Sequence, residues 1–151
     1  MTTIKDYLRL NIKITKQNNM NKLHGYYSME DFVYKNGQSF KARKLPKNIK
    51  LGTMKECYRN AALLAIDNAK YYYVEGYALG VIPVMHAWCI DKNKCVIDPT
   101  WPDGKEYFGV VFKKTYLFKY VEKYKRYNII DNYQHRWPLL KLNKNIWREI
   151  I

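Results

Sequence analysis

Cys57 is the residue best placed in this sequence to act as a nucleophile. It follows Thr53-Met54-Lys55-Glu56, which matches a capping box: the Thr53 hydroxyl and the Glu56 carboxylate would satisfy free amides at a helix start. A cysteine in the first turn of a helix lies beside unpaired backbone amides and the positive end of the helix dipole, and both stabilise thiolate over thiol. The expected chemistry is attack of a thiolate on a carbonyl carbon.

Such a thiolate needs a base, and the base needs a group that orients it. His86 lies inside an expected strand, 84–90, and Asp98 ends the next expected strand, 95–98. An acidic residue within an apolar strand requires a partner if it is buried. We therefore expect His86 to be the partner of Asp98 and the general base and acid for Cys57.

The hairpin that joins these two strands provides a geometric test, because side chains on one face of paired strands must stay in phase. A three-residue turn, 92–94, places Trp88 opposite Asp98. His86 then becomes a diagonal neighbour of Asp98 on the same face. A two-residue turn would put the pair on opposite faces. We therefore predict an irregular turn or a bulge, with Asn93 or a neighbouring residue at positive φ.

The remaining patterns predict the elements that position these residues. A helix over 53–69 has its apolar stripe toward an antiparallel sheet formed by four strands. The other expected elements are an amphipathic helix or strand within 1–22 that becomes loop from Thr15, a hairpin over 32–40 centred on Asn36-Gly37, strands at 71–78, 84–90, 95–98 and 107–112, and a second helix over 116–124 after Thr115. The predicted fold class is α+β.

The length of 151 residues is typical of one domain with a single core. We expect a catalytic core at about 45–125, an N-terminal extension at 1–30 and a basic, aromatic C-terminal segment at 126–151. The 48% hydrophobic and 16% aromatic content excludes a disordered chain. No apolar run reaches the ~20 residues of a membrane span, and the first residues lack the apolar core of a secretory signal.

Three cysteines are too few for a disulfide framework, which favours a reducing, cytoplasmic setting. The net charge of +14, from 27 Lys and Arg against 13 Asp and Glu, favours acidic partners, nucleic acid included. The lysines are dispersed along the chain, however, which is more typical of a solvated basic surface. Abundant Lys, Asn, Ile and Tyr suggest an AT-rich genome such as that of a virus or phage, in which case the setting is the host cytoplasm.

Several blocks in order resemble the transglutaminase-like branch of the papain-like cysteine enzymes. They are the helix-starting Cys57 with its Ala-rich helix, Tyr73-Val74-Glu75-Gly76-Tyr77-Ala78, His86-Ala87-Trp88, and Asp98-Pro99-Thr100-Trp101. The resemblance covers about residues 53–103. It implies a papain-like or transglutaminase-like core in which Cys57 is the nucleophile, His86 the general base and acid, and Asp98 the group that fixes the imidazole tautomer.

Other residues are candidates for contacting the oxyanion or the substrate. Papain-type proteases place a Gln donor six residues before the nucleophile, but Leu51 stands at that position here. The backbone amide of Cys57 is one expected donor. The candidates for the second donor or for substrate contact are Tyr58, Gln38 and Asn60, with Glu75 interpreted equally as a solvent-facing strand residue or a carboxylate near the site, and Trp101 as a core residue or a wall of the cleft.

The expected activity is hydrolysis of an amide or related acyl bond in a peptide, protein or other amide-containing substrate, through a thioester and without metal or cofactor. Transfer of the acyl group to an amine, as in transglutaminases, is the alternative, because both share the first half-reaction. A non-catalytic basic binding module on the same fold is the other alternative. A zinc site from Cys89, Cys95 and His86 is disfavoured, because these side chains do not converge. Oligomeric state stays open.

Overall fold

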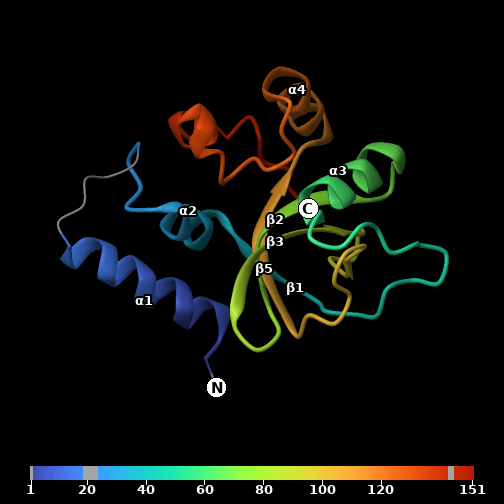
Figure 1. Ribbon diagram of the computed structural model, residues 1–151, viewed down its shortest axis with the longest axis horizontal. Coiled ribbons are helices and arrows are strands. Elements are labelled where there is room, and N and C mark those ends of the chain that lie inside the picture. The colour runs from blue at the N-terminus through green and yellow to red at the C-terminus, as the bar shows by residue number, and fades with distance from the viewer. Residues whose placement is uncertain (1, 19–23, 143–144) are drawn as a thin grey trace.

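The computed structural model describes residues 2–18, 24–142 and 145–151 (Figure 1). It combines helices with an antiparallel sheet, as the predicted α+β class requires. In chain order the elements are α1 (Ile4–Gln17), α2 (Met29–Asn36), β1 (Gln38–Phe40), α3 (Cys57–Asp67), β2 (Tyr72–Leu79), β3 (Pro83–Ile90), β4 (Val96–Ile97), β5 (Glu106–Phe112), α4 (Lys114–Tyr124) and two 3-10 turns (Tyr133–His135 and Pro138–Lys141).

The sheet has the strand order β1-β5-β2-β3-β4, and every pairing is antiparallel. It curls until its two edges meet. Lys41, just after β1, forms a bridge to Cys95, just before β4. Its amide donates to the Lys94 carbonyl at 3.1 Å, and its carbonyl accepts from the Val96 amide at 2.9 Å. The β3–β4 hairpin, which carries His86 and leads to Asp98, is therefore hydrogen-bonded to β2 on one side and to Lys41 on the other.

The two faces of the sheet bury separate apolar clusters. On the outer face α3 packs against β3 and β2 through Ala61, Ala62 and Ala65, whose small side chains let the helix come close to the strands. The concave face is filled from the strands themselves, and its buried residues are Phe40, Val74, Ala78, Trp88, Ile90, Val96, Tyr107 and Val111. Because side chains alternate along a strand, neighbouring residues of β2 and β3 belong to different clusters.

Helix α3 begins at Cys57, so the predicted start at Thr53 is wrong. Residues 53–56 form a turn instead, in which the Glu56 amide donates to the Thr53 carbonyl at 3.3 Å. Lys55 has a φ of 66°, a left-handed conformation that cannot belong to a right-handed helix. Glu56 is the N-cap and makes no side-chain capping bond. Cys57 is thereby the first helical residue, closer to the free amides than the capping box implied.

The predicted hairpin at Asn36-Gly37 is also wrong. Helix α2 occupies 29–36, with the Ser28 hydroxyl accepting from the Asp31 amide at 3.2 Å at its start. Gly37 is the C-cap, and its amide donates to the Val33 carbonyl at 2.7 Å. A Cβ at Gly37 would lie 2.6 Å from that carbonyl oxygen, so the glycine permits the tight helix end rather than a strand turn. β1 follows directly.

The N-terminal segment forms a helix, α1, rather than a strand, and it continues past the expected loop start at Thr15 to Gln17. Thr3 and Asp6 form a capping box there. Its buried stripe, Ile4, Leu8 and Ile12, packs the helix onto the body of the protein beside α2 (Figure 1). None of the described helices combines the length and apolar character needed to cross a membrane.

Candidate active site

The β3–β4 hairpin has the irregular turn that the sequence predicts. Cys89 pairs with Ile97 and Ile90 with Val96, and the Asp91 amide donates to the Cys95 carbonyl at 3.1 Å, which leaves the three residues 92–94 in the loop. Lys94 has a φ of 61°, the predicted positive value. The register prediction is therefore confirmed. Continued by one residue, the same register places Asp98 opposite Trp88, diagonal to His86.

His86 and Asp98 form a buried, short hydrogen bond. Nε2 of His86 donates to Oδ2 of Asp98 at 2.6 Å, since a carboxylate oxygen can only accept. Both residues are buried, with 5% and 2% of their surface exposed. The pair is shielded from water, so its electrostatic interaction is stronger than that of a surface pair.

The Asp98 carboxylate is held by three further donors. The amides of Thr100 and Trp101 donate to Oδ1 at 3.0 and 2.9 Å. Tyr107 lies near the start of β5. Its hydroxyl is 3.0 Å from Oδ2 and 3.1 Å from the Trp101 carbonyl. The Asp-Pro-Thr-Trp block thus folds back on its own aspartate. Sequence reasoning missed Tyr107, because no spacing rule connects β5 with Asp98.

Cys57 completes the group from the start of α3. Its side chain is partly buried, and its thiol lies near enough to the His86 imidazole to raise the pKa of that ring through hydrogen bonding and charge. Because Asp98 occupies Nε2, the nitrogen left for the thiol is Nδ1. Burial of the imidazole opposes its protonation, but the hydrogen bonds with Asp98 and Cys57 outweigh burial and raise the pKa of His86 to about 9. All three predicted triad residues therefore meet.

Two tryptophans surround the imidazole. Trp88 stacks on it with ring centroids 6.1 Å apart, and Trp101 meets it edge-on at 5.9 Å. A Cβ at Gly80 would lie 2.5 Å from the Trp101 ring, so the glycine at the end of β2 makes room for that ring. Of the two interpretations of Trp101, a wall beside the site fits its half-buried position.

Asn60 ties α3 to the Asp98 loop instead of presenting a donor to substrate. Its Nδ2 donates to the Thr53 carbonyl at 2.8 Å and to Oγ1 of Thr100 at 2.9 Å, which uses both amide hydrogens. A Cβ at Gly52 would fall within 2.3 Å of the Asn60 side chain. The Gly52 amide itself donates to the Pro99 carbonyl at 2.6 Å. The segment before Cys57 is thus fastened next to Asp98.

Glu75 is not a solvent-facing strand residue, because it is fully buried on the outer face of the sheet, and its charge acts on Tyr58, the residue that follows Cys57. The carboxylate accepts from the amides of Ile129 and Ile130, at 2.5 and 2.8 Å, and from the Tyr73 hydroxyl at 2.7 Å. Burial raises its pKa to about 7 against the opposing effect of these hydrogen bonds. Glu75 therefore anchors the C-terminal segment, and its β3 partner in the register is Ala87 rather than His86.

Of the two other candidates for oxyanion or substrate contact, Tyr58 is close to the triad and Gln38 is not. Tyr58 follows Cys57 in α3, and burial, then the charges of Glu75 and Cys57, raise its pKa. Gln38 lies in β1, and its Oε1 accepts from Nζ of Lys94, at the turn of the β3–β4 hairpin, at 3.1 Å. The structure therefore does not bring Gln38 to the thiol.

The remaining sulfur and imidazole groups stand apart from the triad. Cys89 is fully buried with its Sγ 3.1 Å from the Ala61 carbonyl, and Cys95 is partly buried, as expected of core and strand-end thiols. His24 and His135 are exposed, as predicted. The described residues contain no group of three or more His, Cys, Asp or Glu side chains that could hold a metal ion.

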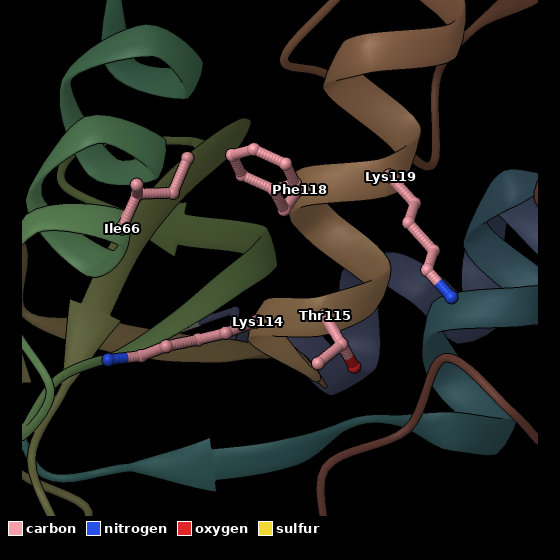
Figure 2. Close-up of a pocket in the computed structure, with 5 residues that line it drawn as sticks. All are labelled: Ile66, Lys114, Thr115, Phe118 and Lys119. Atoms are coloured by element: carbon pink, nitrogen blue, oxygen red, sulfur yellow. The ribbon is translucent and has the colours of Figure 1, made fainter.

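An apolar hollow of about 290 Å³ lies between α3 and α4 (Figure 2). Ile66 and Phe118 face each other across it. Lys114 extends from the start of α4 along the lower edge of the hollow. Nζ of Lys114 donates to the Asn68 carbonyl. No triad residue lines this hollow, so it is distinct from the candidate site.

Comparisons with protein-family models, with curated proteins and with solved structures yield no match.

Proposed function

We propose that this protein is a thiol-dependent hydrolase that cleaves an amide or related acyl bond through Cys57, His86 and Asp98. The observation that carries the proposal is a single imidazole that is hydrogen-bonded to a buried carboxylate at 2.6 Å and whose pKa is raised by a neighbouring thiol at a helix start. This is the arrangement that activates a sulfur nucleophile. The ordered residue blocks support a transglutaminase-like or papain-like form of the fold.

The first half-reaction forms a thioester. The Cys57 thiolate attacks the carbonyl carbon, a carbon–sulfur bond forms, and the carbonyl π electrons move to oxygen. His86 holds a proton at neutral pH because its pKa is raised to about 9. It donates that proton from Nδ1 to the leaving nitrogen as the carbon–nitrogen bond breaks, and Asp98 keeps the ring oriented throughout.

The second half-reaction returns the enzyme to its starting state. Neutral His86 takes a proton from water, the water oxygen attacks the thioester carbon, and the carbon–sulfur bond breaks. The products are a carboxylic acid and the Cys57 thiolate beside protonated His86. An amine in place of water would give acyl transfer, so hydrolysis and transfer differ only in this step.

The first turn of α3 supplies the proposed oxyanion donors. Its N-cap, Glu56, makes no side-chain bond to these amides, which leaves the helix start available to an anion. The backbone amide of Cys57 is the first donor. A neighbouring backbone amide is a better second donor than Asn60, whose side-chain hydrogens are already engaged. The three free thiols agree with a reducing, cytoplasmic setting.

Alkylation by iodoacetamide tests the activated thiol, with the other cysteines as internal controls. At pH 6 we expect Cys57 to react on the order of ten times faster than Cys95, which is also partly buried, because thiolate and not thiol is alkylated. Cys89, which is fully buried, should not react. Mass spectrometry of the digested protein gives the three rates separately.

Replacement of the imidazole provides the matched comparison. His86→Gln should reduce the Cys57 rate to that of Cys95, whereas His135→Gln, at an exposed histidine, should leave it unchanged. Equal rates for Cys57 and Cys95 in the wild-type protein would contradict the proposal. Cleavage of a fluorogenic amide library by wild type but not by Cys57→Ala would extend it from activation to catalysis.

A further inference from the structure

We propose that the groove between α1 and α2 binds the sugar–phosphate backbone of a single-stranded nucleic acid. The groove is a hollow of about 380 Å³, and none of the triad residues lines it. Its lining residues are Arg9, Ile12, Lys13, Lys16, Asp31, Tyr34 and Lys35. In Figure 1 the two helices lie side by side at the edge of the molecule.

Four cationic side chains face this groove from two elements. Arg9, Lys13 and Lys16 follow each other along α1 at intervals of four and three residues, which places them on one stripe of the helix. Lys35 comes from the last turn of α2. All four are exposed, so their charges act on the solvent side. Such a row matches a chain of phosphates better than a single anion.

The carboxylate in the groove neutralises only part of this charge. Asp31 is 3% exposed and accepts from Nζ of Lys35 at 2.9 Å and from the Tyr27 amide at 3.0 Å. It is therefore committed to the start of α2 and to one cation. Arg9 is partly neutralised by Asp6, whose Oδ1 lies 3.5 Å from its Nη1. The charges of Lys13 and Lys16 are left to attract an acidic ligand, and the chain-wide charge of +14 adds to that attraction.

Aromatic side chains are interleaved with the cations. The Arg9 guanidinium donates from Nε to the Tyr34 hydroxyl at 2.9 Å and lies 5.6 Å from the centre of that ring. The Lys16 ammonium lies 4.8 Å from the centre of the Tyr27 ring. These contacts hold long, flexible cations at the groove. A positive groove with aromatic walls is the usual feature of proteins that bind single strands.

The form of the groove favours a strand over an anionic membrane or a duplex. The apolar stripe of α1, Ile4, Leu8 and Ile12, is buried against the protein and cannot enter a bilayer. Reading of a duplex places a protruding helix in the major groove, whereas here the cations line a depression between two helices. A flexible single strand can follow that depression.

Fluorescence anisotropy with a labelled oligothymidylate of about 15 nucleotides tests the proposal across salt concentrations of about 50 to 200 mM. The variant K13Q/K16Q removes two groove cations. The control K119Q/K123Q removes two exposed lysines of α4 and so changes the net charge equally. At 0.1 M salt we expect the groove variant to bind roughly 20-fold more weakly, with a salt slope shallower by about 1.4, and the control to bind like wild type.

Three results would overturn the proposal: equal weakening in both variants, no binding by wild type at the lowest salt, or tighter binding to anionic vesicles or to duplex DNA than to the strand. If the double variant fails to fold, as judged by circular dichroism, the single variants K13Q and K16Q replace it. Iodoacetamide labelling of Cys57 should be the same in every variant. Loss of strand binding is thus separable from failure of the proposed hydrolase.

Discussion

The Tyr107 hydroxyl lies 3.0 Å from the same oxygen of Asp98, Oδ2, that accepts the hydrogen bond of His86. Two donors therefore compete for the charge of one carboxylate oxygen inside a buried network. Gly104 leaves space for that hydroxyl, because a Cβ there would lie 2.4 Å from it. The strength with which Asp98 stabilises the imidazolium thus depends on a residue of β5 that touches neither His86 nor Cys57 by a hydrogen bond.

Tyr107→Phe is expected to raise the pKa of His86 further above its value of about 9. Removing the hydroxyl concentrates negative charge on Oδ2, and a more negative Oδ2 stabilises the charged imidazole. The measurement is an NMR titration of the His86 ring nitrogens. Tyr133→Phe, at an exposed tyrosine, is the control and should leave the titration unchanged. A fall in the His86 pKa on removal of Tyr107 would refute this role.

Asp98→Asn should slow both alkylation of Cys57 at pH 6 and any amide cleavage, the latter by about 10²- to 10⁴-fold. Asparagine keeps Oδ1 for the amides of Thr100 and Trp101 but removes the charge that holds the imidazolium. Alkylation reactions quenched at successive times give the rates of Cys57 labelling. Asp103→Asn changes the charge equally at an exposed position of the next turn and should have no effect. Similar rates in the two variants would exclude a specific role for Asp98.

Gly80→Ala should destabilise the protein by about 1–3 kcal/mol, because its Cβ would lie 2.5 Å from the Trp101 ring. Urea denaturation measures the loss. Since Trp101 also borders His86, the variant should slow Cys57 alkylation as well. A double-mutant cycle with Trp101→Ala isolates the contact: Gly80→Ala should cost much less once the ring is gone. Full additivity of the two changes would show that the ring is not the obstacle.

The free energy of unfolding should fall in two steps as pH rises. Glu75 has a folded pKa of about 7 against 4.5 unfolded, so its proton stabilises the fold at low pH and about 3 kcal/mol is lost between pH 4.5 and 7. His86 has a folded pKa of about 9 against 6.5, so its contribution is complete below pH 6.5 and is lost as pH rises through about 9.

Urea denaturation at intervals from pH 4 to 10 separates the two steps. Glu75→Gln should flatten the lower step and His86→Gln the upper one, each leaving the other step in place. Glu75→Gln should also reduce stability throughout, because the Ile129 and Ile130 amides need two acceptor oxygens and the amide of glutamine offers one. A pH dependence unchanged by both substitutions would contradict the assignment.

The pairing of His86 with Asp98 could be predicted because its geometry depends on the length of one short turn. Turn length alone decides whether His86 and Asp98 share a face, and a three-residue loop with Lys94 at positive φ satisfies that condition. The strands and α4, the helix that follows them, could also be predicted from local sequence, since each has its own hydrophobic periodicity. The predicted α+β class followed from these elements.

The wrong predictions come from local sequence patterns that occur in two different kinds of structure. Asn-Gly ends a helix as readily as it turns a hairpin, and Ser28-Met29-Glu30-Asp31 carries the helix-start signal that would have decided between them. The turn at 53–56 uses the same residue types as a capping box. The hydrogen bonds that hold Asp98 and Glu75 from a distance could not be predicted, because Tyr107 lies 9 residues from Asp98 and the Ile130 amide lies 55 residues from Glu75.

The attachment of the C-terminal segment to Glu75 also constrains when the proposed thiol site can assemble during synthesis. Until residues 129 and 130 have left the ribosome, a carboxylate in the middle of the sheet has no amides to accept from, and burying it would be unfavourable. β1 likewise cannot pair until its partner strand, β5, has been synthesised. A ribosome-bound chain that contains all three triad residues but ends before residue 129 should therefore carry an inert thiol, and reactivity should begin only after residues 129 and 130 have emerged.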